Sequence, residues 1–482
     1  MASPTTITVV ALGKIGLPVA ALYASRGHSV VGCDINPAVV EMVNRGESPI
    51  QHEPGLAEWL RESVAAGRFR ATTDTTAGVA DADVVIVLVP LDVDAAKQPD
   101  FRAMDAAFDA IARGLRPGAL VLVETTVPVG ATRQRFLPIL ESESRRCGRD
   151  FFLAFSPERL QSGRIARDLA AYPRVVGGID PASAERAAAF YRAAHDVDVI
   201  ALSSAEAAEF CKLAESIERD VNIALANELA LYAAAHGVDF FEVLPAANSQ
   251  PQSHLLRPGL GVGGHCMPVY PYLLTGDAER AELTLAGRSI NDGMPRHAAG
   301  LLDDALGGLR DRRVLVLGLT YRPGVKEAAY SPALTLIREL ERRGADCRGH
   351  DPLLTPEEIA RLGVAPATPD GGEPFDLVVI HTADSAYAGL DVREIPGLQA
   401  VLDCAGALDP ARVAQAGAQY LAIGRPSIPA ETGDWGYRGR SPRPEGVGEP
   451  HGWRESRGPG AEPRSEGVGE PYGFPNSERA IP

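Results

Sequence analysis

The stretch TITVVALGKIG, residues 6–16, joins a short apolar run to a glycine-containing turn. The run predicts a buried strand, and helical spacing follows directly in residues 15–27, which close on a glycine. Gly13 and Gly16 occupy the second and third glycine positions of the GxGxxG pattern, whereas Ala11 occupies the first. Gly13 would let the backbone approach a pyrophosphate, and Gly16 would permit close helix–strand packing.

An acidic residue supports this interpretation. Asp34 ends the second strand-like run, HSVVGCD, about twenty residues after the turn, where a carboxylate would accept the ribose hydroxyls. Because the carboxylate would repel a 2′-phosphate, we predict NAD rather than NADP. The alternative is a plain strand–turn–helix. We expect Lys14 and Ile15, within the turn, and Pro90, at the end of a later strand, to contact the cofactor.

Strand-like and helical segments alternate over residues 1–200, which predicts a doubly wound parallel sheet and an NAD-binding domain. Residues 203–237 then form one long helical pattern, within a central helical domain that we place at 201–310. A spine that joins two domains or a dimer interface would explain the length of this helix. Alternation resumes at 311–425 and predicts a second, smaller α/β domain. The expected fold is therefore α/β, with two Rossmann-like domains joined by a long central helix.

The segment 426–482 has a different composition, rich in Gly, Pro, Arg and Glu, and predicts a disordered tail. It contains a near-repeat, EGVGEPHGW from Glu445 and EGVGEPYGF from Glu466. A solvated linker is favoured over a partner-binding motif.

Bulk composition excludes several classes of protein. The chain has 47 Lys plus Arg against 63 Asp plus Glu, which argues against nonspecific binding to nucleic acid or anionic membranes. Its six cysteines show no CxxC spacing and no Cys/His cluster, so we expect no metal site. Scattered cysteines, the lack of a signal peptide and the lack of a long apolar run favour a cytoplasmic protein with no membrane segment.

The loop GVGGHC, residues 261–266, presents one cysteine beside three glycines, Gly261, Gly263 and Gly264. Glycines let a substrate or backbone approach closely, so Cys266 is a candidate nucleophile. The alternative is a small core residue after a turn.

Three other segments carry candidate polar groups. Thr126 lies in ETTVPVG and Glu158 in FSPERLQSGR, both at strand ends, where doubly wound sheets bind ligands. Lys212 and Ser216 lie one turn apart on the long helix and share a face. A buried lysine beside a carbonyl would stabilise an oxyanion. Taken singly, Thr126 and Glu158 are favoured as solvated loop residues, and spacing alone favours Lys212 as a surface lysine.

The order ALGKIGLP, TTVPVG, SPER, KLAES, VNIALANE, PGLGVGGHC and GLTYRPGVKEAAYSPAL resembles the UDP-glucose/GDP-mannose dehydrogenase family over residues 5–410. The stretch from FSPERLQSGR to RVVGGI is most similar to UDP-N-acetylhexosamine and UDP-N-acetylmannosamine 6-dehydrogenases.

The resemblance implies a nucleotide-sugar substrate, a homodimer, and two NAD-dependent oxidations of the sugar C6 alcohol through a thiohemiacetal and a thioester on Cys266. It implies that Lys212, with Ser216, stabilises the oxyanion, that Glu158 performs acid–base work and that Thr126 holds a water; Thr126 and Glu158 also border the cofactor. The substrate side would be lined by residues of the glycine loop and the C-terminal domain: Lys212, Arg257, Gly261, Gly263, Gly264, Tyr321 and Arg322.

Four positions depart from the family pattern. Ser216 replaces an asparagine, Tyr270 an aspartate, and Ala329 and Ala405 replace arginines on the cofactor and nucleotide sides. An ordinary UDP-sugar 6-dehydrogenase is favoured because the nucleophile and its loop are retained. The alternatives are a diverged member acting on an unusual nucleoside or sugar nucleotide, with partial or no net oxidation, and a non-catalytic scaffold.

Overall fold

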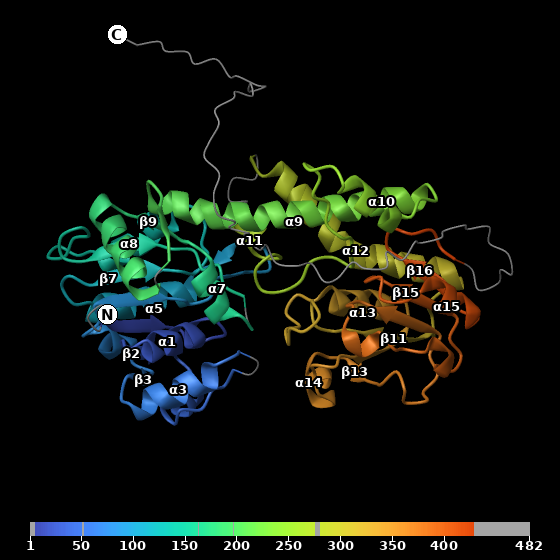
Figure 1. The fold of residues 1–482 in the computed structure, drawn as a ribbon, viewed down its shortest axis with the longest axis horizontal. Helices are drawn as coiled ribbons and strands as arrows, with labels where there is room; N and C mark the ends of the chain where they lie inside the picture. The colour runs from blue at the N-terminus through green and yellow to red at the C-terminus, as the bar shows by residue number, and fades with distance from the viewer. Residues whose placement is uncertain (1–4, 51–52, 162, 196, 275–279, 429–482) are drawn as a thin grey trace, which may run out of the picture. The chain divides into compact units, whose positions relative to one another are not determined.

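Two β-sheets carry the fold of the computed structural model, which describes residues 5–50, 53–161, 163–195, 197–274 and 280–428 (Figure 1). The expected α/β class with two Rossmann-like sheets joined by a long helix is confirmed. Most of the expected disordered tail, 429–482, and both copies of its near-repeat lie outside the described residues.

The first sheet has the strand order β10-β9-β8-β7-β4-β1-β2-β3. Its strands are β1 (Thr6–Val10), β2 (Ser29–Cys33), β3 (Phe69–Thr72), β4 (Val84–Val87), β7 (Leu120–Val123), β8 (Phe152–Phe155), β9 (Arg174–Gly178) and β10 (Val199–Ala201). All neighbouring pairs are parallel except β8 and β9. The prediction of a parallel sheet is therefore wrong for the β8–β9 pair. The chain starts β9 at the end of the sheet where β8 finishes, so the two strands run in opposite directions.

Helices connect these strands and cover the sheet. They are α1 (Gly16–Ser25), α2 (Pro37–Asn44), α3 (Leu56–Ala65), α4 (Thr75–Val79), α5 (Arg102–Gly114), the π-helix η1 (Thr132–Phe136), α6 (Leu137–Leu140), α7 (Ile165–Ala171) and α8 (Pro181–His195). A short antiparallel pair, β5 (Asp92–Val93) and β6 (Pro99–Asp100), follows β4. Two apolar clusters are each built on strands of this sheet, as expected for a doubly wound sheet.

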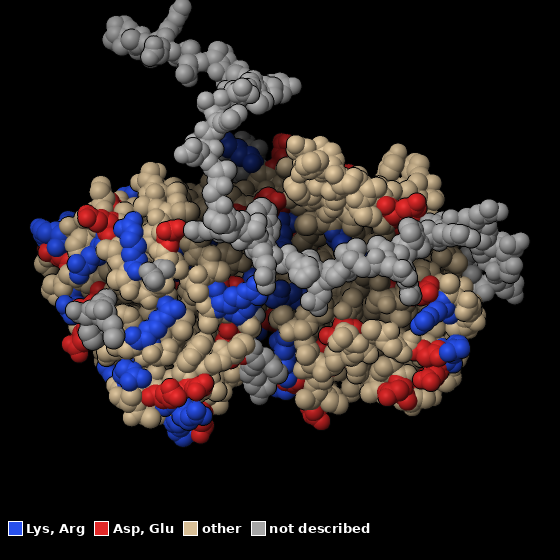
Figure 2. All heavy atoms as spheres, in the orientation of Figure 1, with Lys and Arg blue, Asp and Glu red and all other residues tan. Residues whose placement is uncertain are grey.

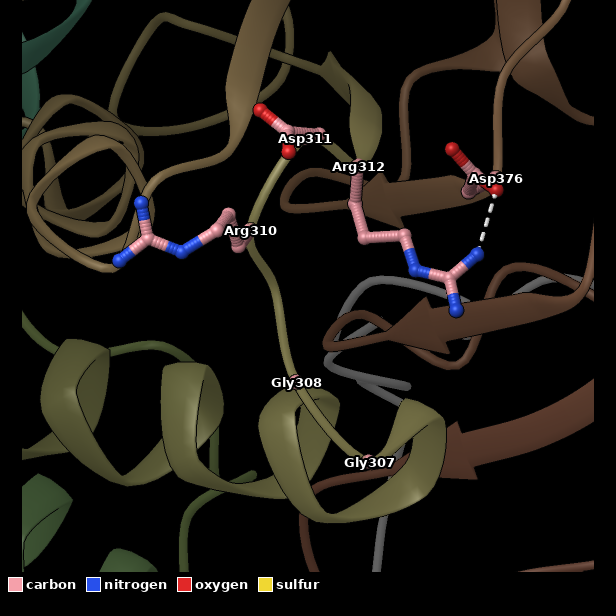
Figure 3. A pocket seen from close by; sticks show the side chains of 6 residues that line it. All are labelled: Gly307, Gly308, Arg310, Asp311, Arg312 and Asp376. Atoms are coloured by element: carbon pink, nitrogen blue, oxygen red, sulfur yellow. Dashed lines mark hydrogen bonds and ion pairs between the residues drawn. The ribbon is translucent and has the colours of Figure 1, made fainter.

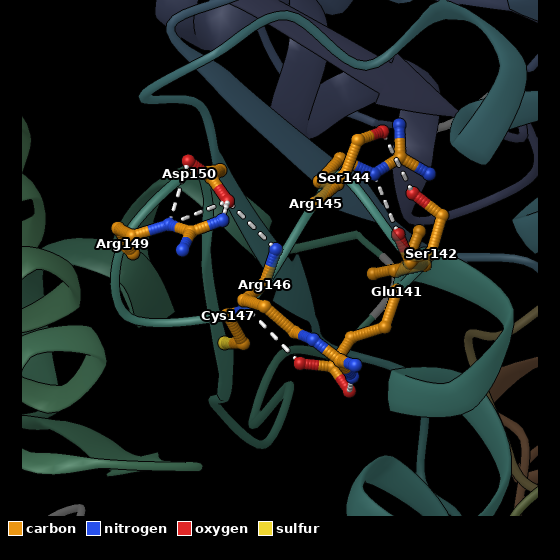
Figure 4. A network of polar contacts seen from close by, with 9 residues as sticks. Glu141, Ser142, Ser144, Arg145, Arg146, Cys147, Arg149 and Asp150 are labelled. Atoms are coloured by element: carbon orange, nitrogen blue, oxygen red, sulfur yellow. Dashed lines mark hydrogen bonds and ion pairs between the residues drawn. The ribbon is translucent and has the colours of Figure 1, made fainter.

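Polar side chains fix the connection from α6 to β8 (Figure 4). The Glu141 and Asp150 carboxylates accept hydrogen bonds from the backbone N–H groups of Cys147 (3.1 Å) and Arg146 (2.8 Å). The Arg149 guanidinium also pairs with Asp150 at 2.6 Å. These contacts hold the chain where it enters β8, at whose opposite end Glu158 follows.

The helix α9 (Ala205–Ala235) is unusually long, about 46 Å at 1.5 Å per residue (Figure 1). Near its start, Ala208 and Leu213 are buried in a core shared with the first sheet. Near its end, Ala230 and Ala233 are buried in a core shared with the second sheet. One continuous helix therefore contributes to both cores.

The remaining elements of the central region are α10 (Phe240–Ala247), α11 (Tyr270–Leu274) and α12 (Glu282–Leu306). The second sheet has the order β13-β12-β11-β14-β15-β16 and is parallel throughout. Its elements are β11 (Arg313–Leu317), α13 (Pro332–Arg342), β12 (Asp346–His350), α14 (Pro356–Arg361), β13 (Ala365–Pro366), β14 (Leu377–Ile380), the 3₁₀ helices η3 (Ser385–Tyr387) and η4 (Val392–Glu394), β15 (Ala400–Asp403), α15 (Pro410–Gln415) and β16 (Gln419–Ala422).

The surface mixes both signs of charge over the face shown in Figure 2. Within the described residues, no helix is both long and apolar enough to cross a bilayer. The same residues hold no group of three or more His, Cys, Asp and Glu side chains arranged for a metal ion.

Candidate active site and cofactor site

The turn after β1 has the geometry of a dinucleotide cradle. Ala11 adopts a left-handed conformation with φ of 80°, which is the conformation that a glycine normally supplies. A Cβ on Gly16 would lie 1.9 Å from the Ala11 carbonyl oxygen, so that position must stay bare for α1 to pack. A Cβ on Gly13 would meet no protein atom within 4 Å, which leaves open space above the turn.

The amino end of α1 opens onto the same space. The Ile15 side chain forms no capping hydrogen bond there, and the Leu17 N–H donates to the Gly13 carbonyl at 3.1 Å, which leaves the Gly16 N–H at the start of the helix for an anion. Asp34, directly after β2, accepts hydrogen bonds of 2.9 Å from the N–H groups of Leu12 and Asn36. The turn and the carboxylate are thus tied together, and these residues fit a dinucleotide with free ribose hydroxyls.

Lys14 has a partner that sequence reasoning missed. Its ammonium forms an ion pair with Glu327, and His265 Nε2 lies 3.3 Å from the same carboxylate. Burial acts to raise the pKa of Glu327, but the His265 and Lys14 side chains and the Ala329 N–H lower it to about 2. Glu327 thus joins the cofactor turn to the residue preceding Cys266. The sequence signal that could have identified Glu327 is its position in the motif GVKEAAYSP.

Pro90, after β4, borders a hollow of about 310 Å³ that is also lined by Asp92 and Asp100. Asp92 accepts a hydrogen bond of 2.9 Å from the Tyr330 hydroxyl. A second hollow, of about 380 Å³, lies at the amino ends of the second sheet's strands, where Arg312 pairs with Asp376 at 2.9 Å (Figure 3). The residues that line this second hollow include none of the predicted site residues, so it is not part of the candidate site.

Cys266 is exposed and lies in the loop before α11. Its main-chain carbonyl accepts hydrogen bonds from Val269 N (3.0 Å) and Tyr270 N (2.8 Å), which fixes the turn that presents the thiol. Desolvation by surrounding protein raises the pKa of the thiol, while a hydrogen bond from Tyr270 and the charge of Lys212 act to lower it. The thiol therefore has a cation and a donor beside it.

The loop glycines are needed for packing within the protein. A Cβ on Gly261 would lie 2.7 Å from the Asn291 carbonyl oxygen, and one on Gly263 would lie 2.6 Å from Tyr321 Cβ. Gly264 has φ of 90°, and its N–H donates to the Ala329 carbonyl at 2.9 Å. The structure thus places Tyr321 and Asn291 against bare faces that were expected to receive the sugar.

Lys212, on α9, donates a hydrogen bond from Nζ to the main-chain carbonyl of Glu158. The same Nζ lies 5.9 Å from the centre of the Tyr270 ring. Burial raises the pKa of the Glu158 carboxyl, and the Lys212 charge opposes that rise. The lysine and the glutamate, predicted from separate segments, are therefore neighbours.

Thr126 follows β7 and is 2% exposed, and its Oγ1 has no hydrogen-bond partner among the described residues. The Tyr270 hydroxyl lies beside it and beside Cys266. A buried, unpartnered hydroxyl suits a water or substrate atom. Thr126 thus has the free hydrogen-bonding capacity that its predicted role requires.

Glu124, a further residue that sequence reasoning missed, links the segment that carries Thr126 to the segment that carries Glu158. Its carboxylate pairs with the buried Arg174 at 3.0 Å and accepts a hydrogen bond of 2.6 Å from Tyr191. The Glu124 carbonyl also accepts from Glu158 N at 3.2 Å. This contact holds the ends of β7 and β8 together.

The residues predicted for the nucleotide side lie among aromatic rings. The Arg257 guanidinium lies 5.4 Å from the centre of the Phe241 ring, and a Cβ on Gly406 would lie 3.5 Å from its Nη2. Arg257 therefore reaches the segment that contains Ala405. Arg322 stacks on Tyr321 at 5.5 Å and contacts the Gln161 side chain at 3.5 Å.

Family models match three segments of the chain. The NAD binding domain of the UDP-glucose/GDP-mannose dehydrogenase family matches residues 5–195, its central domain 206–292 and its UDP binding domain 315–410.

Individual proteins are also similar. UDP-N-acetyl-D-mannosamine dehydrogenase of Pyrococcus horikoshii is 38% identical over 72% of this chain and 83% of its own length. NDP-N-acetyl-D-galactosaminuronic acid dehydrogenase of Ralstonia solanacearum is 36% identical over 70% of this chain and 80% of its own. The solved structure of the Pyrococcus horikoshii UDP-D-ManNAc dehydrogenase covers 87% of this chain and 99% of its own, with a TM-score of 0.80 and 33% identity.

Proposed function

This chain belongs to the UDP-glucose/GDP-mannose dehydrogenase family, and from that premise we propose that it oxidises the C6 alcohol of a UDP-sugar to a carboxylate through a thioester on Cys266. The protein is an NAD-dependent nucleotide-sugar dehydrogenase, an oxidoreductase acting on CH–OH. The convergence of Cys266, Lys212, Glu158 and Thr126 from four separate segments is the observation that supports the cysteine chemistry.

Each side chain has a role that its surroundings allow. The Cys266 thiolate adds to the carbon of the C6 aldehyde, so that a C–S bond forms and the carbonyl π electrons move to oxygen. The Lys212 ammonium stabilises that oxygen. NAD, when bound, would supply the hydride acceptor for each oxidation of the substrate carbon. The cradle that would hold NAD fits it, because a Cβ on Gly13 would meet open space and Asp34 lies at the end of β2.

Hydrolysis regenerates the thiol. A water attacks the thioester carbon, Glu158 takes the proton of that water, the C–S bond breaks and Cys266 leaves as the thiolate. Thr126 Oγ1, which is buried and lacks a partner, holds the water. The raised pKa of Glu158 makes it a stronger base than an ordinary glutamate.

The relatives indicate which sugars to test first. Relatives at 35–38% identity include UDP-N-acetyl-D-mannosamine dehydrogenases and NDP-N-acetyl-D-galactosaminuronic acid dehydrogenases, so nucleotide N-acetylhexosamines are the first substrates to test. Purified protein with NAD and a panel of UDP- and GDP-sugars, followed by NADH absorbance, tests the proposal. Two equivalents of NADH per equivalent of acid support it; failure of every nucleotide sugar contradicts it.

A second candidate, oxidation that stops before the acid, is favoured by one observation. The Ser216 hydroxyl is bonded to its own helix and Tyr270 offers no carboxylate at neutral pH, so two groups of the family site are altered. One equivalent of NADH with an aldehyde product would identify this activity.

A homodimer through the central helices is also part of the proposal. Tyr232 on α9 and Leu283 on α12 are 67% and 70% exposed, and Phe210 on α9 is 52% exposed. Large apolar side chains exposed along the central helices suit a protein interface. Light scattering of the protein and of a Tyr232→Asp, Leu283→Asp variant tests this, since a monomeric parent protein would contradict it. We also propose that the chain divides into an NAD-binding region (1–200), a central region (201–310), a nucleotide-sugar-binding region (311–425) and a tail (426–482).

A further inference from the structure

Tyr270 and Cys266 are held in one turn of chain. The Tyr270 N–H donates to the Cys266 carbonyl at 2.8 Å, and Tyr270 is the first residue of α11. The two residues are four apart, and this main-chain hydrogen bond holds their backbones close together. Tyr270 is also packed against the apolar core of the first sheet, which limits movement of its ring.

The Tyr270 side chain lies among the groups of the candidate site. Its hydroxyl interacts with the Cys266 thiol, whose pKa it acts to lower, and with the Thr126 side chain. The ring itself lies 5.9 Å from Lys212 Nζ, a distance at which an ammonium is attracted to an aromatic face. The Tyr270 phenol therefore has a thiol, an aliphatic hydroxyl and an ammonium as neighbours.

We propose that Tyr270 is a catalytic residue that remains neutral and donates a hydrogen bond to the Cys266 thiolate. A phenol holds its proton at neutral pH, and burial strengthens that hold, so Tyr270 donates a hydrogen bond without giving up or accepting a proton. A donor to a thiolate favours the charged form of the sulfur and so counteracts the desolvation of Cys266. When the thiolate forms a C–S bond, the hydrogen bond weakens and Tyr270 keeps its proton.

This role leaves Glu158 as the proton acceptor of the site, since Tyr270 cannot serve as a base. The inference on catalysis rests on the proposed function, but the effect on the thiol does not. It is therefore tested without substrate or cofactor, by the pH dependence of Cys266 alkylation with iodoacetamide. Peptide mass mapping reports Cys266 separately from the other cysteines. In that reaction the sulfur–carbon bond forms, the carbon–iodine bond breaks and iodide leaves.

The decisive variant is Tyr270→Phe, which removes the hydroxyl and keeps the ring. We expect the alkylation midpoint to move up by about one pH unit, which lowers the rate at neutral pH by about tenfold. Tyr272→Phe is the matched control, because Tyr272 lies on the same helix and its hydroxyl bonds to Asp292 at 3.2 Å. The control should keep the parent midpoint.

An unchanged midpoint in Tyr270→Phe, or an equal shift in Tyr272→Phe, would overturn the inference. Should Tyr270→Phe fail to fold, Tyr270→Met, with a flexible side chain that fills irregular space, replaces it and is judged by the same midpoint. The two failures are distinguishable. If the parent protein oxidises no nucleotide sugar, the proposed function is contradicted. If the pH midpoint of Cys266 alkylation does not change when Tyr270 is substituted, only the role of Tyr270 is contradicted.

Discussion

The hydroxyl of Ser216 donates a hydrogen bond of 3.1 Å to the main-chain carbonyl of Lys212, one turn earlier on α9. The hydrogen that could have stabilised an oxyanion is therefore already used within the helix. Lys212 itself remains directed at the Glu158 segment. The structure brings Ser216 close to the site while satisfying its hydroxyl elsewhere.

Ser216→Ala should consequently change turnover by less than about threefold, since a serine bonded back to the i−4 carbonyl adds little to the helix or to a ligand. Initial rates of NADH formation measure this. Lys212→Met in the same assay provides the contrast, because it removes the ammonium and should reduce turnover far more. A large loss in Ser216→Ala would instead show that the hydroxyl turns to the substrate during reaction.

Glu158→Gln should trap the enzyme as a covalent adduct on Cys266. The glutamine cannot take a proton from water, so the thioester would form but not hydrolyse. Intact-mass spectrometry after incubation with NAD and substrate detects the adduct, and Cys266→Ala in the same background should abolish it. An adduct in the double variant, or on another cysteine, would contradict the assignment of the nucleophile.

Acid formation should depend on pH through Glu158. Burial raises the pKa of this carboxyl, and its base form exists only above that pKa. Activity should therefore fall as pH decreases through a value higher than the ordinary glutamate pKa of about 4.3. The pH profile of kcat measures the midpoint. A midpoint at or below the ordinary value would show that the buried carboxyl is not the base.

Ala11→Gly should stabilise the protein by about 1 kcal/mol, because it relieves a non-glycine residue from the left-handed conformation. Gly13→Ala is the matched substitution in the same turn. Its Cβ would meet no protein atom within 4 Å, so it should leave stability nearly unchanged and weaken NAD binding. Urea unfolding and calorimetric titration with NAD separate the two effects. A lower free energy of unfolding in Ala11→Gly would contradict the backbone strain that we assign to Ala11.

Asp34→Ala should weaken NAD binding and reduce the preference for NAD over NADP. The carboxylate accepts hydrogen bonds from Leu12 N at Oδ2 and from Asn36 N at Oδ1, so Asp34→Asn, which keeps one acceptor oxygen, removes the charge and can keep only one of these contacts. Dissociation constants for both cofactors measure the change. Equal use of NADP by the parent protein would contradict the assignment.

The sequence by itself determined the fold class, the cofactor turn and the order of the motifs. These follow from local chemistry: apolar runs form the buried strands, Gly16 must be bare where α1 meets Ala11, and an acid at the end of β2 follows the turn at a set spacing. The motif order also predicted which polar side chains would meet, because the carboxyl ends of parallel strands share one edge.

Only the tertiary structure decided what surrounds those side chains. The antiparallel pairing of β9 depends on how the chain re-enters the sheet, which strand-like composition does not encode. The Lys14–Glu327 pair joins residues 313 positions apart, and the Tyr270 hydroxyl approaches Thr126 from a distant segment. Long-range contacts of this kind arise from packing of whole elements, so a local pattern can name a residue without showing its partner.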